Sequence, residues 1–130
     1  MRLILASLLI FSFFACQKNK SLELISSSFE RSKGDSATNY EEGIEIFKSL
    51  AKSSPHIEIS RFGYADNGMP LHYIIFSEDQ NFNPFNAEEK NKNIVLINNA
   101  IHAGEPDGTD ACILLLKNLA TQKNLRDSLK

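Results

Sequence analysis

The chain has 130 residues, of which 42% are hydrophobic and 23% charged, an ordinary globular mixture that excludes a fully disordered chain. Its formal net charge of −2, without a cluster of basic residues, argues against nucleic acid as a partner. The two cysteines, Cys16 and Cys112, are too few for a disulfide framework.

The first 15 residues have the pattern of a signal peptide. Arg2 supplies a positive charge, and residues 3–14 are apolar apart from Ser7 and Ser12. This run is too short to span a bilayer, which takes about 20 residues. It fits the hydrophobic region of a signal peptide, so the sequence predicts an exported protein from which residues 1–15 are removed.

The segment Phe13-Phe14-Ala15-Cys16 resembles a bacterial lipobox, in which the cysteine is acylated after cleavage before it. Phe13 stands where lipoboxes usually have an aliphatic residue, so the alternative is a signal peptide with an incidental cysteine. Ordinary signal-peptidase cleavage after Ala15 fits less well, because it favours a small residue at Phe13. We therefore expect Cys16 to be lipidated and to anchor the protein to a bacterial membrane, on the periplasmic or cell-surface side.

Residues 16–37 are polar and rich in serine, and we expect them to form a tether between the anchor and a folded domain of residues 38–130. The domain should begin with a helix, because Thr38 and Glu41 have the spacing of a capping box. Apolar residues then recur at helical intervals, and the helix should end before Pro55.

A β-hairpin is expected next. Residues 57–63 begin with alternating apolar and polar side chains, and residues 71–76 are rich in aromatic and β-branched side chains. Between them, Asn67 and Gly68 indicate a tight turn, because both residues tolerate positive φ. Residues 78–93 are predicted to form a long polar loop.

The second half of the chain predicts a buried strand and a buried helix. Residues 94–97 are apolar without alternation, which is typical of a central strand covered on both faces. A helix should open at Pro106, where the missing N–H costs nothing. Residues 111–116 are apolar nearly all round, so we expect this helix to be buried, with Cys112 as a small core residue. A strand and a helix buried in this way imply an α/β layered fold.

Residues 98–108 connect this strand to this helix, at the edge of an α/β sheet where ligands bind. His102 and Glu105 lie three residues apart in the connection, so an imidazole nitrogen and a carboxylate can point at one metal ion. Zinc accepts both, and catalytic zinc usually has a third protein ligand and a water. The alternatives are a hydrogen-bonded turn histidine and an acidic residue at a helix N-terminus. His56 and His72 are expected to be structural or surface residues.

Three features, in order along the chain, resemble the zinc carboxypeptidases related to carboxypeptidase A. Thr38-Asn39-Tyr40 and the helix after it resemble the opening of the family's domain. Gly63 and Gly68-Met69-Pro70-Leu71 resemble its first hairpin, and residues 94–105 resemble its third strand with the H-x-x-E zinc pair. The resemblance implies an α/β fold, a three-layer α/β/α sandwich around a mixed sheet, with His102 and Glu105 as the first two zinc ligands.

The activity that the resemblance implies is that of a metallocarboxypeptidase, which uses zinc and a glutamate to activate water against a peptide bond near a free C-terminus. The family's third ligand is a later histidine, and no histidine follows His102 here. We therefore expect a fragment that lacks the third ligand and the catalytic glutamate and is inactive alone. Gly104 also stands where many members have arginine, so one polar contact near the scissile bond is not expected.

Two other functions remain open from the sequence. Related amidohydrolases remove acyl groups from amino acids with a similar zinc pair, although an exported and anchored protein favours peptides as substrates. A lipid-anchored module that binds peptide or cell-wall material without catalysis belongs to a different functional class.

Overall fold

The computed structural model describes residues 22–102 and 104–129. The predicted signal peptide and Cys16 therefore lie outside the described residues. Within the described part of the chain, no helix is both long enough and apolar enough to cross a membrane.

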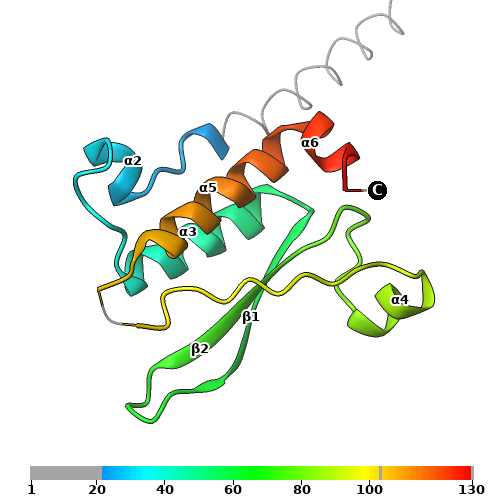
Figure 1. The fold of residues 1–130 in the computed structure, drawn as a ribbon, viewed down its shortest axis with the longest axis horizontal. Coiled ribbons are helices and arrows are strands. Elements are labelled where there is room, and N and C mark those ends of the chain that lie inside the picture. The colour runs from blue at the N-terminus through cyan, green and yellow to red at the C-terminus, as the bar shows by residue number, and fades with distance from the viewer. Residues whose placement is uncertain (1–21, 103, 130) are drawn as a thin grey trace, which may run out of the picture.

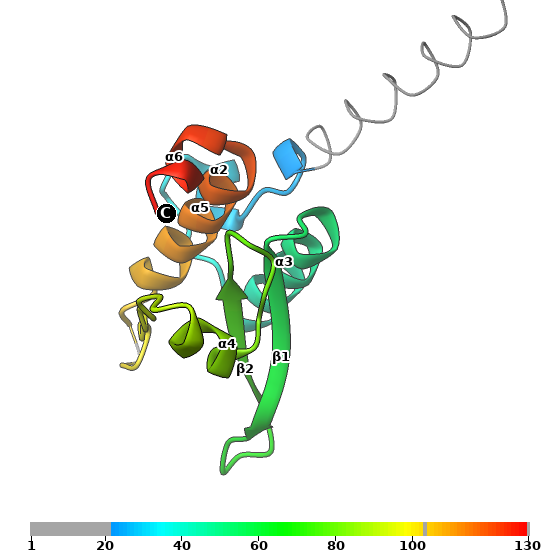
Figure 2. The same cartoon turned by 90° about the vertical axis from the view of Figure 1, so that its right-hand side faces the viewer.

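The described chain combines helices with one antiparallel hairpin. Figures 1 and 2 show α3 and α5 close together near one end of the hairpin, with α4 beside the hairpin and away from α2 and α6. This mixture is compatible with an α/β fold, whereas the three-layer sandwich stays a prediction. In chain order the elements are α2 (Ser28–Ser32), α3 (Tyr40–Ser53), β1 (Ile57–Tyr64), β2 (Pro70–Phe76), α4 (Pro84–Glu89), α5 (Asp107–Thr121) and α6 (Lys123–Asp127).

Helix α3 forms where the apolar periodicity predicted it, but its cap differs. The N-cap is Asn39, whose side chain accepts a hydrogen bond of 2.9 Å from the Glu42 N–H. The predicted capping box of Thr38 and Glu41 is therefore wrong. The physical reason is that Thr38 is buried and gives its hydroxyl and its N–H to Asp110, so it is not free to cap α3.

The hairpin is confirmed. β1 and β2 pair antiparallel, with Ile57 opposite Phe76, and a register shift lies between Arg61 and Gly63. The turn has Gly68 at φ +82°, the left-handed region that glycine adopts without a steric penalty. One end of β1 packs on α3, because Ile57 belongs to the core.

The loop predicted for residues 78–93 contains a short helix, α4. Asp79, which precedes α4, forms ion pairs of 2.6 Å with Lys92 and 3.0 Å with Lys90, which both follow it. These two ammonium groups, Lys92 first, hold the pKa of the Asp79 carboxyl well below its usual range. These ion pairs join the two ends of the segment that contains α4.

Residues 94–97 do not form the predicted central strand. They run as irregular chain, and their side chains are 56–87% exposed. An apolar run becomes a central strand only when other strands hydrogen-bond to both of its edges. Among the described residues, β1 and β2 pair only with each other, so the run has no neighbouring strand.

Helix α5 begins at Asp107, one residue later than predicted, with Pro106 as its N-cap, and it is buried on one side only. Ile113, Leu119 and Ala120 are buried, whereas Leu115 is 39% exposed, so the expectation of burial all round is wrong. Cys112 is partly buried and packs against the core. The core lies between α3, α5, the start of β1 and the N-terminal segment, and its buried members are Leu22, Ile46, Phe47, Leu50, Ile57, Ile113 and Ala120.

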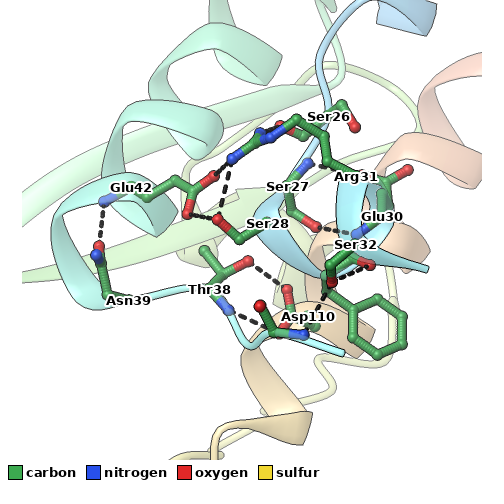
Figure 3. Close-up of polar contacts among 12 residues, drawn as sticks. Ser26, Ser27, Ser28, Glu30, Arg31, Ser32, Thr38, Asn39, Glu42 and Asp110 are labelled. Carbon is green, nitrogen blue, oxygen red and sulfur yellow. Dashed lines mark hydrogen bonds and ion pairs between the residues drawn. The ribbon is translucent and has the colours of Figure 1, made fainter. Parts of the chain in front are cut away.

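The segment predicted to be a tether packs on the domain from residue 22 onward. Leu22 is 2% exposed in the core, and α2 begins with a capping box in which the Ser27 side chain and the Glu30 side chain each accept from the other's backbone N–H. Figure 3 shows the next layer of contacts, in which Ser28 and Arg31 donate to the carboxylate of Glu42 in α3. These hydrogen bonds, the Ser28 one first, lower the pKa of Glu42. The polar composition of this segment predicted a tether. The contacts that attach it to α3 could not be predicted, because they join residues that are 11 and 14 positions apart in the sequence.

Candidate metal centre

His102 and Glu105 lie in the connection that leads into α5, at the yellow-to-orange transition in Figure 1. The Glu105 N–H approaches the carbonyl of His102 at 3.4 Å, which closes a tight turn. Gly104 has φ +90° inside this turn, a backbone conformation that residues other than glycine rarely adopt. The turn therefore brings the backbone of the two candidate ligands together.

The two side chains also meet. Nδ1 of His102 lies 3.0 Å from Oε2 of Glu105, and the side chains are 70% and 69% exposed. Two ligands placed about 2.0–2.2 Å from a tetrahedral zinc ion are roughly 3.4 Å apart, so this spacing needs little change to fit. An imidazole nitrogen beside a carboxylate oxygen is also a donor set that zinc accepts. The pair therefore fits two positions of a zinc site.

Among the described residues, no third ligand lies beside them. The part of the chain that the structure describes contains no group of three histidine, cysteine, aspartate or glutamate side chains able to hold a metal. His56 lies at the start of the hairpin, with Nδ1 3.2 Å from the carbonyl oxygen of Ser77. His72 lies in β2, with Nδ1 3.3 Å from the Tyr40 hydroxyl. Neither belongs to a group of possible ligands with His102 and Glu105 in the described part of the chain.

Asn99 fixes the connection against α5, a role that sequence analysis missed. Its Nδ2 donates to Sγ of Cys112 at 2.9 Å. A Cβ atom at Gly108 would lie only 2.5 Å from Cβ of Asn99, so the absence of a side chain at Gly108 is what permits this close approach. The Gly108 position, early in a predicted helix where glycine is unfavourable, was the available signal.

Asp110 fixes α5 from the other side, and it too was missed. It is 3% exposed and accepts a 3.1 Å hydrogen bond from the Thr38 N–H together with one from the Thr38 hydroxyl, as Figure 3 shows. Gly43 of α3 approaches Thr109 nearby, where a Cβ would lie 3.6 Å from Cγ2 of Thr109. The first turn of α5 is thus held between Asn99 and Thr38, next to the candidate ligands.

Comparison with protein families finds one that fits this arrangement. The model of the zinc carboxypeptidase family matches residues 44–129, which include both candidate ligands and all of α5. Neither the curated proteins nor the solved structures contain a match to the chain. The family match covers well over half of the 130 residues, and the chain therefore belongs to the zinc carboxypeptidase family.

Proposed function

We propose that this chain contributes His102 and Glu105 as two zinc ligands of a metallocarboxypeptidase-like hydrolase that cleaves peptide bonds. The observation that carries the proposal is the 3.0 Å approach of these two side chains, in a turn within the family-matched residues. The same membership implies zinc as the metal and a peptide as the substrate class.

The roles proposed for the chain's own residues are limited to binding the zinc ion and positioning its ligands. His102 offers a nitrogen, Glu105 offers a carboxylate oxygen, and Gly104 lets the turn close between them. Bound zinc would lower the pKa of a coordinated water to about 7 and polarise a carbonyl. Catalytic zinc usually has three protein ligands, so the proposed site needs a further donor from outside the described residues.

Zinc binding measured by calorimetry tests this proposal. We expect His102→Ala and Glu105→Ala each to weaken zinc binding at least about tenfold, because each removes half of the donor pair. The matched control is His72→Ala, which removes a histidine that lies elsewhere and should leave the affinity within about twofold of the starting value. Affinity should also fall as the pH is lowered, because protons compete for the imidazole.

If His72→Ala weakens binding as much as His102→Ala, the metal is bound elsewhere and the proposed pair is wrong. Substrate class is decided separately, on the zinc-loaded protein that contains this chain, with a peptide that has a free C-terminus and with an N-acyl amino acid. Release of the C-terminal residue supports the carboxypeptidase, and hydrolysis of the acyl amino acid alone supports the amidohydrolase. Binding of either without hydrolysis supports the non-catalytic module.

We further propose that Cys16 is acylated and holds the exported protein on a membrane surface, on the strength of the lipobox-like segment that ends at Cys16. Bacteria that express the chain should incorporate labelled palmitate into it, and Cys16→Ser should abolish the label. Cys112→Ser is the matched control and should keep it, because Cys112 packs against the core. A wild-type protein without label would refute the anchor and leave the zinc proposal untouched.

A further inference from the structure

Residues 22–38, here called the N-terminal strap, run along α5 in the opposite direction to the helix. At one end of the strap, Thr38 hydrogen-bonds to Asp110 in the first turn of α5. Further back along the strap, the carbonyl of Ile25 accepts from Nζ of Lys117. Leu22, at the other end, shares the core with Ala120 near the end of α5. The chain therefore enters the domain beside the C-terminal end of α5.

Buried and ionic contacts hold the strap in place. Lys117 forms an ion pair with Glu30, and the two side chains are only 15% and 22% exposed. Leu22 is in the core, and Ser27 is buried and caps α2. Burial of Leu22 removes apolar surface from water, and the shielded ion pair fixes the strap on α5, because separating the partners would leave a charge without its partner. The strap therefore belongs to the domain and does not behave as a flexible linker.

The candidate zinc pair lies at the opposite end of α5 from the entry of the strap. His102 and Glu105 come immediately before the helix, whereas Leu22 precedes Ile25, whose carbonyl accepts from Lys117 in the second half of α5. At 1.5 Å per residue, the 15 residues of α5 separate these two ends by about 22 Å. Figures 1 and 2 show the same separation, with the start of α5 on the side away from α6.

We propose that the strap orients the anchored domain, with the C-terminal end of α5 toward the membrane and the candidate zinc pair facing away from it. This inference rests on the proposed acylation of Cys16. Only five residues separate Cys16 from Leu22, so the six steps from one Cα to the other span at most about 21 Å. A free tether over residues 16–37 would reach about 75 Å and would impose no orientation.

The end of the domain near the strap's entry also has side chains suited to a membrane surface. Leu24 is 80% exposed, two residues after the buried Leu22. Leu129 is 57% exposed and follows Arg126, whose guanidinium donates to the last carbonyls of α5 at Leu119 and Ala120. In this orientation the zinc pair meets water-soluble peptides, and substrates embedded in the bilayer lie out of its reach.

Energy transfer from single tryptophans to a dansyl-labelled lipid tests the orientation, because the natural chain has no tryptophan. One reporter replaces Leu129 at the proposed membrane end, and the other replaces the exposed Asp107 at the zinc end. The chain from residue 16 onward, carrying Cys112→Ser, is coupled through Cys16 to a maleimide lipid in vesicles. We expect at least about threefold more efficient transfer from Leu129→Trp than from Asp107→Trp, because α5 separates the two ends by about 22 Å.

Releasing the strap should remove the difference. Lys117→Glu places a carboxylate beside Glu30, and Leu22→Asp places a charge in the core, so the double variant should bring the two reporters to similar efficiencies. Circular dichroism and the hairpin's stability verify that the rest of the domain stays folded, and Lys48→Glu on the exposed face of α3 serves as the matched control. Equal transfer from both reporters in the intact strap would overturn the proposal. Chemical coupling makes this result independent of whether bacteria acylate Cys16, which palmitate labelling decides.

Discussion

Replacing Asp110 by alanine should lower the free energy of unfolding by about 2–4 kcal/mol, a large part of the 5–15 kcal/mol typical of a domain. Asp110 is 3% exposed and accepts from both the N–H and the hydroxyl of Thr38, which is itself 5% exposed. Without the carboxylate, two buried donors of Thr38 lose their partner and pay the cost of desolvation. The midpoint of urea unfolding, followed by circular dichroism at neutral pH, measures the change.

Asp107→Ala is the matched control for this prediction. Asp107 is also an acidic residue in the first turn of α5, but it is exposed. Its removal should cost only the interaction with the helix dipole, about 0.3–1 kcal/mol. Asp110→Asn should recover part of the loss, because the amide oxygen can still accept from the Thr38 N–H while the hydroxyl turns to accept from the amide. Equal losses for Asp107→Ala and Asp110→Ala would show that Asp110 acts only as a helix-end charge.

Local patterns predicted the elements whose stabilising contacts are local. The hairpin follows from alternation and from a turn that includes Gly68, and the periodicity of α3 follows from one apolar face. The cap of α3 was misassigned because Thr38 bonds to Asp110, 72 residues away. A pairing at that separation leaves no mark on the spacing of nearby residues, and the same holds for the burial of Leu22 in the core.

In the candidate site, too, local contacts could be predicted from the sequence and long-range contacts could not. Spacing predicted that the side chains of His102 and Glu105 could meet, because the two residues are three positions apart in a turn, and Nδ1 of His102 lies 3.0 Å from Oε2 of Glu105. The roles of Asn99 and Asp110 could not be predicted, because each depends on which element packs against α5. The predicted strand at residues 94–97 failed for a related reason, since a central strand depends on neighbours that its own sequence does not specify.

Residues 94–97 should make the isolated chain associate with itself, and charges placed there should prevent it. All four side chains are large and apolar and at least 56% exposed, on a segment with no neighbouring strand among the described residues. Exposed apolar runs with unpaired backbone groups join other chains by strand pairing and by burial of apolar surface. Val95→Lys with Leu96→Lys charges both faces, because successive side chains of an extended segment point in opposite directions. We expect self-association at a protein concentration of about 100 μM to weaken at least about tenfold in sedimentation velocity.

Phe85→Lys is the matched control, because Phe85 is 75% exposed in α4 and lies outside the run. If exposed apolar surface of any kind drives association, Phe85→Lys should reduce it as much as a charge in the run does. If the run itself pairs with another chain, Phe85→Lys should leave association unchanged, and Val95→Pro should reduce it by removing a backbone donor. A wild-type chain that sediments as a monomer at this concentration would show that residues 94–97 are covered in solution by contacts within the chain.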